Sequence, residues 1–305
     1  MRAVYPVARA AITLCRRGAA RVSAYGLEQG LALKEPLLVE LLNYAKTISI
    51  LSQPKTFSLM SLHPNLVNVC FRSYLVESFE KPERRAALAH HYNYIERRVR
   101  STFYPDIYHD RTLLWGRKSG DTAPCISLIF DTQYHAEGDL TLVMTSGGVK
   151  VYALAFSIVP GPLVGLSDSE VLLVTRVQGQ KAQLEAIRRA TKSCYDVAPP
   201  FLLLDCAKAI ARTLGVTNVV GVSSREQIGV AGDEGESFDY DAFWNGYLGS
   251  ESAARFYTLP VAYSGKALEQ INAAHRRRTK RKRQFRRKVS EEVGASFADL
   301  CLNKS

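Results

Sequence analysis

The chain has 305 residues, a formal net charge of +11 at pH 7, 47% apolar residues and 23% charged residues, values close to the averages of globular proteins. Ten of the basic residues lie within the fourteen residues His275–Lys288, so the positive charge is local. A basic surface spread over the whole protein, as in many duplex-DNA binders, is therefore not indicated.

Membrane spans and secretion signals are not expected. The longest apolar run, which begins at Val151, is broken by Pro160 and Pro162 before it reaches the roughly 18 residues that a span needs. Near the N-terminus, Arg9 interrupts the apolar stretch that a secretory signal requires. The six cysteines include no CxxC pair, which favours free thiols over disulfides or a zinc site. We expect a cytoplasmic protein without a bound metal.

Helical patterns dominate residues 1–110, which we expect to form a helical N-terminal region. The first helix has apolar residues at helical spacing at Leu38, Leu41, Leu42 and Ala45. A later helix opens near Pro82, a residue that suits the first helical turn. Its residues predicted to share one face are Leu88, His91, Tyr92 and Ile95.

From Thr112 the apolar pattern changes to that of strands. The runs ISLIFDT, DLTLVMTS, VKVYALAFSIV and EVLLVTRVQG follow one another, and Gly147 and Gly148 stand where a tight hairpin turn is needed. Two helices, AQLEAIRRATKSCY and PFLLLDCAKAIARTLG, then precede the strand VTNVVGVSS and the short strand RFYTLP. Residues 111–305 are therefore predicted to form an α+β domain with a largely antiparallel sheet.

Between the last two strands, FDYDAFWNGYLG mixes acidic and aromatic residues. On a helix, Tyr240, Phe243 and Trp244 share a face. We expect this face to anchor the C-terminal helix in the core, with Asp239 paired to a cation of that helix.

A long basic C-terminal helix is predicted over residues 267–290. At about 100° per residue, one apolar stripe runs on both sides of the basic stretch through Ala267, Leu268, Ile271, Phe285, Val289 and Val293. Arg278 and Lys282 fall on the same stripe. Three uses of the cations stay open: exposed solvated charge, a cleft in which Arg278 and Lys282 meet phosphate or carboxylate groups, and nucleic acid along the exposed face.

An ordered set of short motifs resembles the bacterial VirK/YbjX family. The motifs are HHY from His90, EGDLTL from Glu137, VQG from Val177, ATKSCYDVAPPFLLL, VVGVSS, FDYDAFW, YTLP and the basic final helix. They extend from about Gln53 to Lys288. Because the family is a domain of unknown function, the resemblance implies a fold and a grouping and brings no settled reaction.

The order of strands and helices is also similar to the core of the Gcn5-type N-acetyltransferases. In that superfamily the loop after the long strand offers backbone N–H groups to the pyrophosphate of an acyl carrier, and the next helix adds its dipole. Here RVQGQK keeps Arg176 and Gly179 of the loop pattern. The similarity implies an acyl or aminoacyl transferase with a phosphate-bearing donor such as an acyl-CoA, an acyl carrier or an aminoacyl-tRNA.

Acyl transfer needs a base for the attacking group and donors for the oxyanion or leaving group. Glu137 is the expected catalytic base, and His91 with Tyr92 is a second candidate whose alternative is packing against the sheet. The residues expected to bind the donor are Arg176, Gln178, Gly179, Lys192, Ser223, Arg278 and Lys282. The alternative function is a non-enzymatic regulatory protein whose basic helix binds tRNA, another nucleic acid or an anionic surface.

Overall fold

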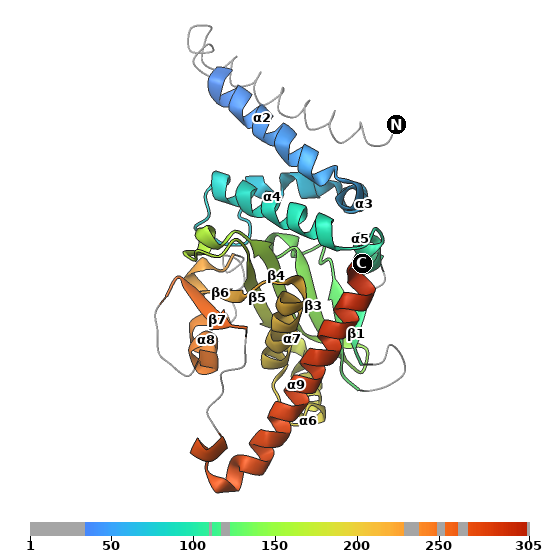
Figure 1. The fold of residues 1–305 in the computed structure, drawn as a ribbon, viewed down its shortest axis with the longest axis vertical. Coiled ribbons are helices and arrows are strands. Elements are labelled where there is room, and N and C mark those ends of the chain that lie inside the picture. The colour runs from blue at the N-terminus through green and yellow to red at the C-terminus, as the bar shows by residue number, and fades with distance from the viewer. Residues whose placement is uncertain are drawn as a thin grey trace.

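A computed structural model describes residues 34–109, 112–116, 123–228, 238–248, 254–261 and 268–303. Helices fill the described part before residue 112, as predicted (Figure 1). They are α2 (Lys34–Leu51), α3 (Pro54–Leu62), the 3-10 helix η1 (Pro64–Phe71), α4 (Lys81–Arg98) and α5 (Phe103–His109). In the described part of the chain, no helix is long and apolar enough to cross a membrane.

Two of these helices test the sequence patterns. α4 opens with a capping box between Glu80 and Glu83, with Pro82 in its first turn, and packs against the sheet through a face that includes the fully buried His91 and Tyr92. In α2, however, Leu42 is 54% exposed, and the buried residues among the side chains that the structure describes, from residue 39 on, are Tyr44, Thr47 and Leu51. The spacing therefore predicted the helix but not its buried face, because the ring of Tyr44 packs on Phe71 of η1.

The described strands form one sheet in sequential order β1 to β7. They are β1 (Thr112–Trp115), β2 (Cys125–Ile129), β3 (Leu140–Ser146), β4 (Val149–Val159), β5 (Val171–Gly179), β6 (Asn218–Val222) and β7 (Phe256–Pro260). Gly147 and Gly148 have φ of 60° and 78° and join β3 to β4 as the predicted hairpin. All neighbouring pairs are antiparallel except β5 and β6, so the fold is α+β with a mostly antiparallel sheet.

The parallel pair is connected by α6 (Leu184–Ser193) and α7 (Pro199–Leu214), and α7 covers β3, β4 and β5. Pairing of β5 with β6 is confined to Val171–Val174, so the rest of β5 is paired with β4 alone. Beyond this point the backbone N–H of Val177 donates to the hydroxyl of Tyr240, 3.1 Å away. β5 thus extends beyond the end of its pairing with β6, which ends at Val222.

The next helix, α8 (Tyr240–Leu248), corrects two expectations. Trp244 is buried, but on β6: its indole N–H donates to the carbonyl of Val222 at 2.7 Å, and a Cβ on Gly221 would lie 2.4 Å from its ring. Asp239 accepts a hydrogen bond from the N–H of Ala242 at 2.9 Å, as an N-cap residue does, rather than pairing with a C-terminal cation. The aromatic face therefore anchors α8 to the sheet.

The final helix, α9 (Ala273–Cys301), runs through the whole basic stretch and packs on α7 and β1 (Figure 1). It begins six residues later than predicted, because Asn272 caps it with a side-chain oxygen 3.0 Å from the N–H of Ala274. Ala267 lies outside the described residues. The predicted stripe is buried at Val289 and Val293 and continues to Phe297 and Cys301.

Candidate anion-binding pocket

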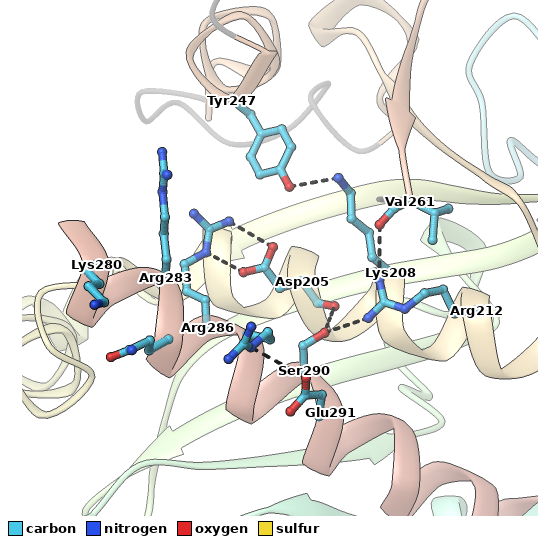
Figure 2. A pocket seen from close by; sticks show the side chains of 12 residues that line it. Asp205, Lys208, Arg212, Tyr247, Val261, Lys280, Arg283, Arg286, Ser290 and Glu291 are labelled. Atoms are coloured by element: carbon cyan, nitrogen blue, oxygen red, sulfur yellow. Dashed lines mark hydrogen bonds and ion pairs between the residues drawn. The ribbon is translucent and has the colours of Figure 1, made fainter. Parts of the chain in front are cut away.

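A pocket of about 660 Å³ lies between α7 and α9, with Tyr247 of α8 and Val261, which follows β7, on its other sides (Figure 2). Six basic and two acidic side chains line it, which leaves a formal excess of four positive charges. The basic residues are Lys208, Arg212, Lys280, Arg283, Arg286 and Arg287, and the acidic ones are Asp205 and Glu291. Such an excess favours an anionic ligand.

The two walls arise from helical spacing. α7 turns Asp205, Lys208 and Arg212 to one side at intervals of three and four residues, and α9 does the same with Arg283, Arg286, Arg287 and Ser290. The helices approach closely beside the pocket, since a Cβ on Gly294 would lie 3.3 Å from Thr213 Oγ1. Charged residues of two distant segments therefore meet across a short gap.

A bidentate ion pair fixes the inner part of the pocket. Arg286 Nε and Nη2 lie 2.5 and 2.9 Å from the two carboxylate oxygens of Asp205. Ser290 Oγ donates to the carbonyl of Asp205 at 3.2 Å, and Arg212 donates to Ser290 Oγ at 2.9 Å and to the carbonyl of Val261 at 3.1 Å (Figure 2). These bonds hold α7, α9 and the end of β7 together, so the inner cations are preorganised.

Lys208 is a buried amine within this charged wall. Its side chain is 4% exposed, and Nζ donates to the hydroxyl of Tyr247 at 2.8 Å. Among the described residues, no carboxylate forms a salt bridge with Lys208, because the Asp205 carboxylate is engaged by Arg286. Burial lowers the pKa of Lys208 to about 8; Asp205 opposes this shift, while Arg286 and Arg212 add to it.

The outer part of the pocket is more open to solvent. Lys280 and Arg287 are exposed, and Arg287 Nε lies 3.7 Å from Glu291 Oε1, one turn along α9. An exposed pair of this kind is weak and exchanges readily with other partners. The pocket thus combines fixed inner cations with rim cations that can turn toward an incoming anion.

Arg278 and Lys282, which the sequence placed in a cleft, lie away from this pocket. Arg278 Nη2 contacts Asp196 Oδ2 at 2.9 Å, and Lys282 Nζ donates to the carbonyl of Asp196 at 2.8 Å. Lys192 is an exposed residue of α6. A phosphate-binding role for these three residues stays a prediction. In the structure, the basic helix contacts an acidic residue of the protein itself, Asp196.

The structure does bring together three other predicted residues. Arg176, which is 3% exposed, places Nε 3.4 Å from Glu137 Oε2 and 2.8 Å from Gln178 Oε1. Gln227 donates to Glu137 Oε2 at 3.1 Å, and the Arg176 guanidinium lies 3.6 Å from the centre of the Tyr134 ring. Burial raises the pKa of Glu137, and Arg176 partly opposes that shift. Glu137 is thus a partly desolvated carboxylate beside the part of β5 that extends past its pairing with β6.

Gly179 and Ser223, two further residues predicted to bind the donor, make structural contacts at the ends of their strands. Gly179 ends β5 opposite Tyr152, where a Cβ would lie 2.6 Å from the tyrosine ring, so close packing alone accounts for a glycine. Ser223 is buried, and its N–H donates to the carbonyl of Arg255 at 3.2 Å.

His91 and Tyr92 belong to a fully buried polar network between α4 and the sheet. His91 Nδ1 accepts from the N–H of Ile158 at 3.0 Å, and Tyr92 donates to Asp139 Oδ1 at 2.9 Å. The other carboxylate oxygen of Asp139 accepts from Tyr74 at 2.6 Å and from Ser157 at 2.5 Å. Burial raises the pKa of Tyr92 and lowers that of His91. This arrangement matches the alternative given above, in which His91 and Tyr92 pack against the sheet.

Sequence reasoning missed the residues that form the pocket. Asp205, Lys208 and Arg212 interrupt the otherwise apolar α7 on one side of the helix, and that pattern was a usable signal. Its partner surface on α9 could not be identified from spacing, because nearly every position of the basic stretch carries a cation. Among the described residues, no cluster of three or more His, Cys, Asp and Glu side chains could hold a metal ion.

Comparison with known proteins agrees with the resemblance drawn from the motifs. A family model described as "Protein of unknown function (DUF535)" matches residues 37–295. The "Uncharacterized protein YbjX" of Escherichia coli (strain K12) is 22% identical over 254 residues, which cover 80% of this chain and 76% of that protein. No solved structure matches the chain. The chain belongs to the DUF535 family, and the acetyltransferase-like core stays a prediction.

Proposed function

We propose that this member of the DUF535 family binds a phosphate-bearing ligand in the pocket between α7 and α9. The observation that carries the proposal is the pocket's formal excess of four positive charges, which includes two cations, Lys208 and Arg212, whose described hydrogen-bond partners are neutral. Lys208 meets a hydroxyl, and Arg212 meets a hydroxyl and a carbonyl. Buried or clustered charge without a counter-charge is unfavourable, and a bound anion removes that penalty.

Phosphate is an anion that the arginine and lysine side chains of the pocket can bind. Arginine presents a planar fork that matches two phosphate oxygens, and lysine adds a compact charge. The volume of about 660 Å³ falls within the range of roughly 300–1,000 Å³ typical of small-molecule sites. Tyr247 and Val261 supply apolar surface for the part of the ligand that carries no charge.

The test is ligand-induced stabilisation with pyrophosphate, ATP and coenzyme A. At a ligand concentration one hundred times Kd, binding to the native state adds about 2.7 kcal/mol to the free energy of unfolding. The variant Arg283→Gln/Arg287→Gln should lose at least tenfold in affinity. The matched variant Arg278→Gln/Lys282→Gln removes the same charge outside the pocket and should bind as the native protein does. Equal losses in the two variants would contradict the pocket.

Acyl or aminoacyl transfer is the more specific form of the proposal. Its support is that acyl-CoA, acyl carriers and aminoacyl-tRNA all carry phosphate, and that the partly desolvated Glu137 lies beside Thr175, where the pairing of β5 with β6 has ended. Glu137 does not line the pocket. Donor binding and turnover are therefore measured separately.

Nucleic-acid binding along α9 is a second candidate. The observation that favours it is a run of exposed cations at the start of the helix, which extends past the sheet (Figure 1). The exposed cations there are Arg276, Arg277, Arg278, Lys280 and Arg281. Binding to RNA through n phosphate contacts would weaken with salt, with a slope in log–log form of about 0.7n for single strands. An affinity that does not change with salt would exclude this surface.

A further inference from the structure

Of the lysines whose side chains the structure describes, Lys208 alone is buried. Lysine usually keeps its ammonium group in water, and a buried one is commonly paired with a carboxylate. Here the acidic side chain on the same helix, Asp205, accepts hydrogen bonds from both Nε and Nη2 of Arg286. Lys208 is therefore a buried amine whose described hydrogen-bond partner is the Tyr247 hydroxyl.

The surroundings favour the neutral form of this amine. Arg212 and Arg286 line the same pocket as Lys208, from α7 and α9, and like charge together with burial makes protonation unfavourable. With a pKa of about 8, Lys208 is uncharged in about one molecule in ten at pH 7, against fewer than one in a thousand for an ordinary lysine. A desolvated lysine beside other cations is a common arrangement for nucleophilic amines that attack carbonyl groups.

We propose that Lys208 is a covalent attachment site for a phosphate-bearing aldehyde or ketone, which it holds as an imine. The inference rests on the proposed function, because the pocket cations would hold the phosphate of the same molecule. In this arrangement Arg283 and Arg287 bind the phosphate near the rim, and Lys208 attacks the carbonyl carbon deeper in the pocket.

The chemistry balances without an oxidant or reductant. The Nζ lone pair forms a C–N bond to the carbonyl carbon while the C=O π electrons move to oxygen, and transfer of a proton from nitrogen to oxygen gives a carbinolamine. The hydroxyl then takes up a second proton and leaves as water as the C–O bond breaks and the nitrogen lone pair forms the C=N bond, and the iminium nitrogen gives up its remaining proton, which replaces the one donated, to leave the neutral imine. The Tyr247 hydroxyl, 2.8 Å from Nζ, is placed to pass a proton to the leaving oxygen.

The test uses pyridoxal 5′-phosphate, which carries both an aldehyde and a phosphate, on the full chain. After borohydride reduction, peptide mass spectrometry should find the adduct on Lys208. Pyridoxal, which lacks the phosphate, should react at least tenfold more slowly. 4-Deoxypyridoxine 5′-phosphate, which lacks the aldehyde, should bind and protect Lys208 without forming an adduct. The variant Lys208→Met should lose the adduct, and the matched surface variant Lys288→Met should keep it.

The rate of labelling as a function of pH separates Lys208 from an ordinary lysine. For a pKa of about 8, the neutral fraction rises about tenfold between pH 7 and pH 9 and then levels off, whereas an unperturbed lysine gains about 100-fold. Labelling that is spread over exposed lysines, or a rate that keeps rising above pH 9, would overturn the inference.

The outcomes distinguish the two proposals. If 4-deoxypyridoxine 5′-phosphate binds but pyridoxal 5′-phosphate leaves Lys208 unlabelled, the imine is wrong and anion binding stands. If neither phosphate compound binds, and pyrophosphate, ATP and coenzyme A also fail, both proposals fall. The site of labelling in the native protein decides the inference even where Lys208→Met does not fold.

Discussion

At the scale of single residues, the buried Lys208 links the pocket to stability. The unfolded chain binds a proton at this lysine up to pH 10.4 or so, whereas the folded chain releases it near pH 8. Between these values the unfolded state holds more protons, so the free energy of unfolding rises with pH. Relative to Lys208→Met, the native protein should gain about 2 kcal/mol between pH 7 and pH 9.5.

Denaturant unfolding at several pH values measures this difference, with Lys288→Met as the control. Lys288 is a largely exposed residue of α9. The difference between the native protein and Lys288→Met should stay flat with pH. A flat difference for Lys208→Met as well would mean that Lys208 keeps the pKa of a solvated lysine when folded.

Glu137→Gln separates a catalytic from a structural carboxylate. The change keeps the shape of the side chain and removes its basicity, so acyl transfer with a donor and acceptor found by screening should slow by about 10²-fold to 10⁴-fold. Because Arg176 also loses its charged partner, Tm should fall, and turnover is measured well below it. The exposed Glu185→Gln is the control. Unchanged turnover in folded Glu137→Gln would show that Glu137 only positions Arg176.

At the scale of the elements, the contact between α7 and α9 depends on the Asp205–Arg286 pair. Arg286→Gln leaves the buried Asp205 carboxylate poorly compensated, so this change should destabilise the protein by about 3 kcal/mol. The double variant Asp205→Asn/Arg286→Gln should lose less than the sum of the single changes. Urea unfolding of the four proteins measures the coupling, and strict additivity would mean that the pair does not stabilise the contact.

The same elements show how far the sequence could be read. Strands β2 to β5 were predicted because each is a short apolar run bounded by turn residues, and the hairpin because Gly147 and Gly148 can take positive φ. The start of α9 was placed too early, since apolar spacing carries no information about the cap at Asn272. The partner of Asp239 was wrong because a local backbone N–H competes well with a distant cation.

The candidate pocket was harder to predict than the fold. Helical phase placed Arg278 and Lys282 on the docked side of α9, and both do meet an acidic residue, Asp196. Which cations would surround a cavity depends on how α9 crosses α7, and that depends on contacts such as Gly294 against Thr213. Pairing of distant helices is tertiary information that periodicity within one segment does not contain.

At the scale of the whole molecule, the N-terminal helices and the sheet share one continuous core. Polar contacts cross the same boundary: Tyr74 and Tyr92 bind Asp139, and His91 accepts from Ile158. The end of α9 returns to the N-terminal helices, where the N–H of Arg100 donates to the carbonyl of Cys301 at 2.9 Å. Neither part can open without exposing buried surface and unpaired polar groups of the other.

We therefore expect a single cooperative unfolding transition rather than separate transitions for residues 1–110 and 111–305. The two tryptophans report on different elements, because Trp115 of β1 packs edge-on against Phe285 of α9 and Trp244 is buried between α8 and β6. Fluorescence of Trp244→Phe, which leaves Trp115 as the reporter, and far-ultraviolet circular dichroism, which follows all the helices, should give coincident urea curves. A circular dichroism transition that precedes the fluorescence change would instead show that the N-terminal helices unfold as an independent unit.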